Sequence, residues 1–288
     1  METTPSPANM EALADARSLY RALLGREIDE GAVNALVSAP KPPSSFEQSM
    51  QLLMSPEYLT WLTRHAADAH LYLIHRARQI MVRRLLPPAD DVLDLGGAAA
   101  PLYTFGWTHP FTRMVLVDLA PEARHEAFRD VVLASPTGAG EVAVHYGDMT
   151  RLERYADESF DLVWSGQSIE HVDQDAGRRM TEEALRVLRP GGHFCLDTPN
   201  RRVTQIHTRS VGGGFVHPDH KLEYHADDLR ELLTACGFEI AAARGVCEMP
   251  RTLATGVFEY EDFVLGSVLT DKPEDGYVLY FDGRKPGG

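Results

Sequence analysis

Residues 92–97 read Val-Leu-Asp-Leu-Gly-Gly, and residues 114–119 read Met-Val-Leu-Val-Asp-Leu. Both segments are short apolar runs with one acid near the end, and the first also ends in two glycines. Continuous branched apolar residues are typical of a strand buried inside a parallel sheet, and glycines let the chain turn tightly against a ligand. An acid at the end of the following strand can accept hydrogen bonds from two ribose hydroxyls. The two segments therefore predict an α/β fold with a site for a nucleotide-type cofactor.

Two nucleotide-type cofactors could occupy this site, a dinucleotide or S-adenosylmethionine. A dinucleotide site requires the spacing Gly-x-Gly-x-x-Gly at the start of a helix, whose amides hold the pyrophosphate. Residues 96–101 read Gly-Gly-Ala-Ala-Ala-Pro and lack this spacing. The Tyr-x-x-x-Lys pair of nicotinamide-dependent sugar enzymes is also missing, because none of the ten tyrosines has a lysine four residues later. The sequence therefore favours S-adenosylmethionine.

The first segment resembles motif I of the class I S-adenosylmethionine-dependent methyltransferases, which reads acid-x-Gly-x-Gly-x-Gly. Asp94 and Gly96 occupy the first two places, whereas Ala98 and Ala100 replace the later glycines. Four further segments resemble the same family, in the same order along the chain. They are Tyr146–Met149, Phe160–Ser165, the Pro-Gly-Gly turn of Leu188–Gly192, and Ala235–Ile240.

This resemblance implies the Rossmann-like methyltransferase fold, an α/β structure with a doubly wound, seven-stranded and mostly parallel sheet. The expected strand order is 3-2-1-4-5-7-6, in which the last strand, at residues 276–282, inserts antiparallel to its neighbours. Right-handed crossover helices would connect the parallel strands. These helices are expected at residues 121–133, 176–188 and 226–235.

The resemblance also implies which residues bind S-adenosylmethionine. The glycines after the first strand would admit the methionine portion, Asp118 would bind the ribose hydroxyls, and Asp148 and Met149 would contact the adenine. The predicted cofactor-binding residues are Asp94, Gly96, Gly97, Asp118, Leu119, Asp148, Met149 and Ser165.

The predicted fourth strand leads into Gly166-Gln-Ser-Ile-Glu-His-Val-Asp173. Its Glu-His-Val element resembles that of the ubiquinone-biosynthesis O-methyltransferases, in which this Glu-His pair and an earlier acid can bind a divalent metal near the acceptor. Gln167 stands in place of that acid, so we expect no metal ion and little effect of EDTA. His171 could instead be a general base for an acceptor hydroxyl. An equally favoured interpretation is that Glu170 and His171 only cap the next helix and line the site.

A long loop is expected after the predicted fifth strand. Its two ends, Thr198-Pro-Asn-Arg and His217-Pro-Asp-His-Lys-Leu-Glu-Tyr, resemble methyltransferases that act on hydroxyls of sugars, glycans and natural products. The histidines and carboxylates of this loop could also ligate a metal, but no two of them have a diagnostic spacing within one helix. These residues are His207, His217, Asp219, His220, Glu223 and His225.

The sequence thus predicts an enzyme that transfers a methyl group from S-adenosylmethionine to a hydroxyl of a small molecule, such as a sugar, glycan or natural product. The predicted catalytic residues are His171, with His217 and His220 behind it. The predicted substrate-binding residues are Gln167, Glu170, Asn200 and Arg201. Two alternatives stay open: methylation of a small-molecule amine, and a methyltransferase-like subunit that binds its ligand without catalysing a reaction.

Residues 1–85 differ in pattern from the rest of the chain, because their apolar residues recur at helical spacing. The expected helices cover residues 10–24, 28–37, 46–53 and 55–86. Pro87-Pro88 marks the start of the predicted methyltransferase domain, residues 86–288. The first segment resembles small helical modules related to phycobilisome-linker domains. A helical lid over the cofactor, or an arm that pairs two copies of the chain, is at least as well favoured.

Composition limits the partners and the compartment. The chain has 288 residues, 44% of them apolar, and a net charge of −14, which would repel the phosphates of a nucleic acid. Its three cysteines show no C-x-x-C spacing, so neither a disulfide framework nor a zinc knuckle is expected. No signal peptide and no run of about eighteen apolar residues is recognised. We therefore expect a soluble, cytoplasmic protein with a small-molecule acceptor and neither a nucleic-acid nor a membrane partner.

Overall fold

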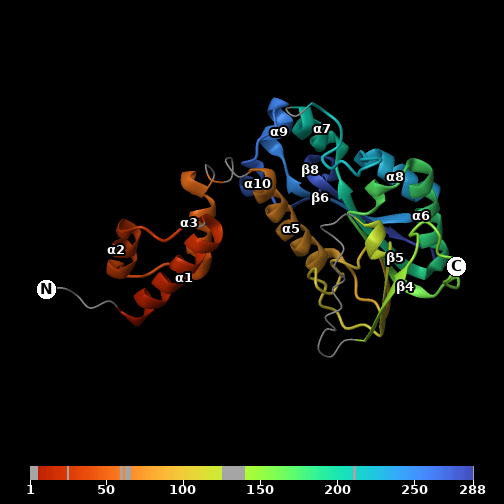
Figure 1. The fold of residues 1–288 in the computed structure, drawn as a ribbon, viewed down its shortest axis with the longest axis horizontal. Helices are drawn as coiled ribbons and strands as arrows, with labels where there is room; N and C mark the ends of the chain where they lie inside the picture. The colour runs from red at the N-terminus through yellow and green to blue at the C-terminus, as the bar shows by residue number, and fades with distance from the viewer. Residues whose placement is uncertain are drawn as a thin grey trace. The chain divides into compact units, whose positions relative to one another are not determined.

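The computed structural model describes residues 6–24, 26–58, 61, 66–124, 140–209 and 212–287. The chain forms two compact units, Met1–Leu73 and Ile74–Gly288. The described part of the first unit is helical, whereas the second unit contains a sheet with helices packed on it (Figure 1).

The first unit is built from α1 (Pro7–Leu24), α2 (Glu30–Ser38), α3 (Ser45–Leu53) and the first part of α5 (Ala66–Leu85). Buried Asn9 fastens α2 to α1, because its side-chain amide donates to the carbonyls of Leu36 (2.7 Å) and Ala39 (2.9 Å). Ser44 and Glu47 form a capping box that starts α3. The first three helices predicted from the sequence are therefore present, as α1, α2 and α3. The start of the expected fourth helix falls partly on residues outside the described ranges.

Helix α5 passes from the first unit into the second, and the division lies between Leu73 and Ile74. The sequence placed the domain boundary later, between residues 85 and 86. The two positions differ because the second half of α5 is apolar on one side and packs in the core of the second unit. Its buried apolar residues there are Ile74, Ala77, Met81 and Val82. This half of α5 is therefore part of the second unit.

The second unit contains one sheet with the strand order β3-β2-β1-β4-β5-β8-β6-β7. The strands are β1 (Asp91–Leu95), β2 (Arg113–Asp118), β3 (Glu141–Tyr146), β4 (Phe160–Gly166), β5 (Leu188–Pro199), β6 (Glu239–Glu248), β7 (Leu269–Thr270) and β8 (Gly276–Arg284). Strands β1 to β5 pair in parallel, and β8 pairs antiparallel with β5 and β6. The prediction of seven strands is wrong, because the short β7 adds an eighth strand beside β6.

Alternate residues of each strand point to opposite faces of the sheet. On one face Val92 and Met114 belong to a core that includes α5. On the other face Leu93 and Val115 pack in a core with α6 (Gln174–Val187) and α8 (Ala226–Ala235). Figure 1 shows α5 on one side of the sheet and α6 with α8 on the other. The middle parts of the central strands are mostly apolar because both of their faces are buried.

The segment after β5, which the sequence predicted as a long loop, begins with helix α7 (Arg201–Arg209). Asn200 starts this helix, since its side-chain oxygen accepts from the amide of Arg202 (3.1 Å) and its carbonyl accepts from the amide of Thr204 (2.9 Å). Asparagine is a strongly preferred residue at this capping position. The loop that follows α7 is therefore shorter than expected, and residues 212–225 are its described part.

Several further helices are short. They are η1 (Pro121–Ala123), η3 (Ile169–His171), α9 (Pro250–Thr255), α10 (Asp262–Leu265) and η4 (Pro273–Asp275). The helix expected at residues 121–133 starts as η1, and most of it falls on residues 125–139, outside the described ranges. Within the described ranges, no helix has both the length and the apolar character needed to cross a membrane.

Candidate active site

The turn after β1 is built around Asp94. This carboxyl is buried and accepts a hydrogen bond from the amide of Leu102 (2.8 Å), which closes the loop between the two residues. Burial raises the pKa of Asp94 to about 7, and the hydrogen bond from Leu102 opposes that shift only in part. Gly97 lies against the carboxyl, and a Cβ at this position would overlap it. The acid itself therefore requires a glycine at residue 97.

Gly96 brings the segment after β4 against the same turn. Its φ of +84° is in the left-handed region, which glycine adopts without strain. A Cβ on Gly96 would collide with the hydroxyl of Ser168, and this hydroxyl donates to the carbonyl of Leu95 (3.0 Å). The chain between β4 and α6 therefore lies in direct contact with the predicted cofactor turn.

Asp118 lies at the end of β2, beside this turn. One carboxylate oxygen accepts from the amide of Ala98 (3.1 Å), and the other accepts from the amide of Leu119 (2.7 Å). The Nε atom of Arg124 lies 3.5 Å from the second oxygen. The side chain of Asp118 keeps 13% of its surface exposed, and an ionised carboxylate offers about four acceptor positions. Asp118 is thus suited to bind ribose hydroxyls in addition to the two amides.

The other predicted cofactor residues differ in exposure. Asp148 is exposed, and its Oδ1 accepts hydrogen bonds from the amide and the hydroxyl of Thr150, both at 2.8 Å. Leu119 is 50% exposed, and Met149 is half-buried against the core. Ser165 is completely buried near the end of β4, and its hydroxyl has no hydrogen-bond partner among the described residues. Asp148 and Leu119 are therefore accessible from solvent, whereas Ser165 is not.

Three histidines meet beyond the end of β4. His171 ends η3, and His217 and His220 lie on the loop between α7 and α8. The ring centroid of His171 is 5.0 Å from that of His220 and 6.0 Å from that of His217. The rings of His217 and His220 are 5.4 Å apart. The structure thus brings together the three residues predicted as catalytic, which we call the histidine cluster.

The surroundings of His171 make it a weak base. Burial of its ring lowers its pKa most, and His220 and His217 lower it further, so that the pKa is about 4. The residue as a whole is exposed, although its ring lies close to those of His217 and His220. At neutral pH His171 is therefore uncharged and keeps a free lone pair, but it would hold a proton weakly.

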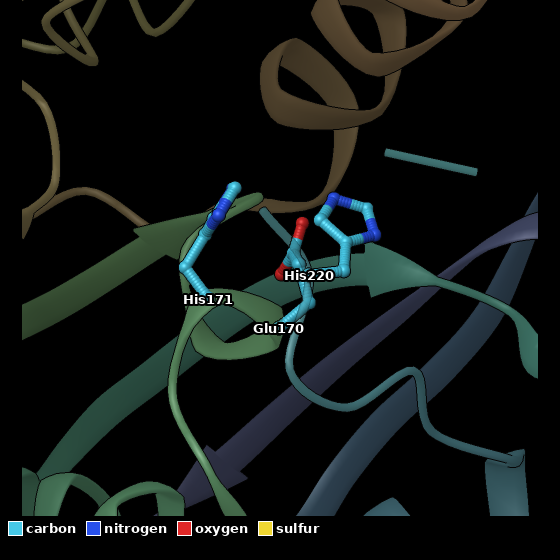
Figure 2. Close-up of side chains that lie close together, drawn as sticks. All are labelled: Glu170, His171 and His220. Carbon is cyan, nitrogen blue, oxygen red and sulfur yellow. The ribbon is translucent and has the colours of Figure 1, made fainter. Parts of the chain in front are cut away.

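Glu170 lies directly before His171 and is completely buried. Its Oε2 accepts from the hydroxyl of Thr198 (2.9 Å), while Oε1 has no hydrogen-bond partner in the described part of the chain. Burial raises the pKa of Glu170 to about 7, although nearby His220 acts in the opposite direction. Figure 2 shows this carboxyl between the rings of His171 and His220. One possible ligand atom from each of the three residues lies within 4.8 Å of the other two.

His220 is held in place by Glu223. The Nδ1 atom of His220 is 2.8 Å from Oε1 of Glu223, which also accepts from the amide of Val216 (2.9 Å), and Oε2 accepts from the hydroxyl of Thr204. Burial acts to raise the pKa of Glu223, but the hydrogen bonds together lower it. The carboxylate is therefore ionised at neutral pH, so Nδ1 of His220 donates and Nε2 keeps its lone pair.

The remaining predicted substrate-binding residues form hydrogen bonds within the protein. Gln167 donates from its amide and its side chain to Oδ1 of Asp197 (3.0 and 3.3 Å). Asn200 is completely buried, and its side-chain amide donates to two main-chain carbonyls. Arg201 donates to the carbonyl of residue 214 and, more weakly, to Glu223 (3.4 Å). These three residues hold the loops around the site together.

His207 and His225 do not join the histidine cluster. His207 lies on α7, where its ring stacks on Phe258 and its two nitrogens meet the hydroxyls of Tyr277 (2.8 Å) and Tyr260 (3.0 Å). His225 is an exposed residue that directly precedes α8. Of the four loop histidines that the sequence offered as metal ligands, the structure brings His217 and His220 together with His171.

The buried ion pair between Arg78 and Asp197 was not predicted from the sequence. The guanidinium of Arg78 on α5 donates to both oxygens of Asp197 (2.5 and 2.9 Å) near the end of β5, and both side chains are buried. An acid in an apolar strand was a visible signal of a buried partner. The partner itself lies 119 residues earlier in the sequence, so no local pattern connects the two.

Comparisons with known proteins show what the chain is similar to. Residues 93–196 match a family model described as a methyltransferase domain. Over 105 residues, 36% of this chain and 38% of the relative, the chain is 38% identical to a probable S-adenosylmethionine-dependent methyltransferase of Mycolicibacterium smegmatis. Over 170 residues, 50% of this chain and 59% of the relative, it is 31% identical to the 27-O-demethylrifamycin SV methyltransferase of Amycolatopsis mediterranei. The chain thus spans about half the length of the curated relatives it matches.

A solved structure shows the same fold. The S-adenosylmethionine-dependent methyltransferase of Thermotoga maritima, described as a possible histamine N-methyltransferase, aligns with a TM-score of 0.52 at 18% identity, over 82% of this chain and 99% of that one. At this identity the likeness concerns the fold alone. The fold, the family match and the relatives together support a class I methyltransferase domain. The cofactor of this class is S-adenosylmethionine, and the turn around Asp94, Gly97 and Asp118 fits it.

Proposed function

We propose that this chain transfers a methyl group from S-adenosylmethionine to a hydroxyl of a small molecule, such as a sugar, glycan or other natural product. One observation carries the proposal. Ser168 joins the cofactor turn at Leu95 to η3, the short helix that ends at His171, so the segment that carries His171 starts at that turn. The relative from Amycolatopsis, named for 27-O-demethylrifamycin SV, supports a natural product as the acceptor.

The proposed reaction needs alignment, exclusion of water and a proton acceptor. S-adenosylmethionine supplies the methyl group on a positively charged sulfur, which is already a strong electrophile. Asp118 holds the ribose hydroxyls, and Asp148 with Met149 contacts the adenine. The acceptor oxygen forms a bond to the methyl carbon as the carbon–sulfur bond breaks. Its proton passes to an imidazole of the histidine cluster.

We also revise the order of preference among the candidate bases. His171 was expected to be the leading base, but its pKa of about 4 means that it would hold the acceptor proton only weakly. His220 is oriented by the carboxylate of Glu223, and the ring of His217 lies 5.4 Å from that of His220. We therefore place His217 and His220 ahead of His171 as proton acceptors.

The histidine cluster also favours a hydroxyl over an amine as the acceptor. An amine that has lost its proton is nucleophilic without help, whereas a hydroxyl must lose its proton as the methyl group transfers. The ring centroids of the three histidines lie within 6.0 Å of one another, beside the buried carboxyl of Glu170. These groups can accept the proton that a hydroxyl must lose. The net charge of −14 further disfavours acceptors that are rich in phosphate.

A direct assay tests the proposed function. The purified full chain would be titrated with S-adenosylmethionine and with NAD by calorimetry. It would then be incubated with S-adenosylmethionine and a panel of sugar, glycan and polyketide hydroxyl compounds with matched amines. Formation of S-adenosylhomocysteine and of a product heavier by one methylene group would be followed by mass spectrometry.

The proposal predicts binding of S-adenosylmethionine but not of NAD, and turnover with members of the hydroxyl panel. Turnover with amines alone would show an N-methyltransferase and contradict the choice of a hydroxyl. Binding without turnover on any acceptor would instead support the inert binding subunit. The Asp118→Ala variant serves as the matched control, because it should lose turnover at low cofactor concentration while the fold is kept.

A further inference from the structure

A set of metal-ligating groups lies within the histidine cluster. Glu170 and His171 come from η3, directly after β4, and His220 comes from the loop before α8 (Figure 2). One ligand atom from each of the three residues lies within 4.8 Å of the others. Nitrogen and oxygen ligands around a transition metal ion lie about 2.1 Å from it, and therefore about 3 to 4 Å from one another. Small side-chain rotations would close the remaining gap.

Glu170 supplies an independent sign that a ligand belongs here. Its carboxyl is completely buried, yet Oε1 has no hydrogen-bond partner in the described part of the chain. A buried carboxyl oxygen without a partner is unfavourable, so such groups are normally paired or bound to a metal ion. The hydroxyl of Thr198 fixes the other oxygen at 2.9 Å and so orients the carboxyl between the two imidazoles.

His220 is oriented as metal-binding histidines usually are. Such a histidine commonly donates from one ring nitrogen to a carboxylate, which fixes the tautomer and leaves the other nitrogen for the ion. Nδ1 of His220 is 2.8 Å from Oε1 of Glu223, and Glu223 is itself held by the amide of Val216 and the hydroxyl of Thr204.

We propose that Glu170, His171 and His220 bind one divalent transition metal ion, such as Mn²⁺, Co²⁺ or Zn²⁺. Two imidazoles and one carboxylate suit these ions better than Mg²⁺ or Ca²⁺, which prefer oxygen ligands. Three protein ligands leave further coordination positions open for water or for an oxygen of the acceptor. Binding of the ion does not depend on the proposed function. Its use to hold the acceptor hydroxyl does rest on the proposed function.

This proposal revises the expectation, drawn from Gln167, that the chain has no metal ion. Gln167 does not supply a ligand, because its side chain donates to Asp197 instead. The third ligand comes from His220, on a loop far along the sequence. An acceptor hydroxyl bound to the ion would lose its proton more easily. His220, as a ligand of the ion, would no longer be available as a base, so His217, whose ring lies 5.4 Å from that of His220, is the imidazole that accepts this proton.

Metal binding can be measured without any methyl acceptor. The full chain, without an affinity tag, would be stripped with a chelator and titrated with Co²⁺ and Zn²⁺ by calorimetry and, for Co²⁺, by visible absorption. We expect one ion per chain. Glu170→Gln, His171→Ala and His220→Ala should each weaken binding at least about tenfold. Glu223→Gln, which acts only through His220, should weaken it about 10-fold to 100-fold.

Two matched histidine variants serve as controls. His225→Ala removes an exposed imidazole beside the same loop, and His217→Ala removes the neighbouring ring of the cluster, so both should bind the ion as the wild type does. His171 has exposed surface, so its variant should fold even if Glu170→Gln does not, and circular dichroism would check each fold. A wild type that binds no ion, or variants that bind as the wild type does, would overturn the site.

The role of the ion and the proposed function can fail separately. Ion binding that is lost in the three ligand variants, in a protein that methylates nothing, would keep the metal site and reject the methyltransferase activity. Turnover that is unchanged in fully stripped protein would keep the activity and reject a role for the ion in it. Inhibition by EDTA that added Mn²⁺ or Zn²⁺ reverses would support both.

Discussion

The hydroxyl of Ser168 donates a hydrogen bond to the main-chain carbonyl of Leu95 over 3.0 Å. Leu95 ends β1 and Ser168 follows β4, and these two strands are parallel neighbours in the sheet. The bond therefore connects the cofactor turn with the segment that carries Glu170 and His171. Ser168 also fills the space that any side chain at Gly96 would need. The two halves of the site are thus coupled through one buried hydroxyl.

Asp118→Ala should weaken the binding of S-adenosylmethionine by about 1 to 3 kcal/mol, the effect of losing hydrogen bonds to a charged acceptor. Isothermal titration of the folded variant measures this change. Asp175→Ala, which removes an exposed acid from the first turn of α6, is the matched control and should bind as the wild type does. Unchanged affinity in Asp118→Ala would show that the ribose lies elsewhere.

Gly97→Ala should destabilise the protein by about 1 to 3 kcal/mol, because its Cβ would overlap the buried carboxyl of Asp94. Urea denaturation followed by circular dichroism gives the free energy of unfolding. Gly147→Ala is the matched control, since a Cβ at that glycine meets no atom within 4 Å. Equal stability of the two variants would mean that the turn relaxes around the new methyl group.

Asp94 should make the protein less stable as the pH rises. Its pKa is about 7 in the folded chain and near 3.8 in the unfolded chain, so the folded state binds more protons between these values. Stability therefore falls from about pH 4 to about pH 7, by about 1.4 kcal/mol for each unit by which the two pKa values differ. Asp94→Asn should remove this part of the decrease, as measured by thermal unfolding across that range. A pH dependence identical to that of Asp175→Asn would contradict this prediction.

Two deletions should differ sharply in their effect. Removal of residues 1–60 should leave a folded core that binds S-adenosylmethionine. Removal of residues 1–85 also takes away Met81 and Val82 from the core and leaves the buried carboxylate of Asp197 without Arg78, a loss of about 3 to 5 kcal/mol from the ion pair alone. Thermal unfolding and cofactor titration would compare the two proteins. A shorter deletion that precipitates would show that the first helices complete the second unit.

The fold could be predicted largely from local patterns. Apolar runs such as residues 92–95 read directly as strands buried on both faces, and the resemblance supplied their order. The eighth strand was missed because Leu269–Thr270 is too short to give a periodic signal. Helix α7 was missed because the segment Arg201–Arg209 is mostly polar, although Asn200 was a usable start signal.

The candidate site could be predicted only in part. The acids of the cofactor turn lie at the ends of strands and its glycines follow directly, so their positions are visible in the sequence. The partners of Glu170 and Arg78 are not visible in the sequence, because these residues meet Thr198 and Asp197 through tertiary packing between distant segments. The pKa values of His171 and Glu170 depend on burial for the same reason, and burial of a single polar residue cannot be read from local spacing.

The main-chain carbonyl of Glu170 accepts hydrogen bonds from the amides of Lys221 and Leu222 (2.7 and 3.2 Å). Tyr224, at the end of the same loop, forms a β-bridge with Asn200. These anchors use backbone atoms, which every amino acid except proline provides as donors. The exposed part of this loop, residues 212–215, can therefore diverge in evolution without shifting the register of the residues near Glu170. New acceptor preferences can arise by exchange of that short stretch, while the groups that bind the cofactor stay as inherited.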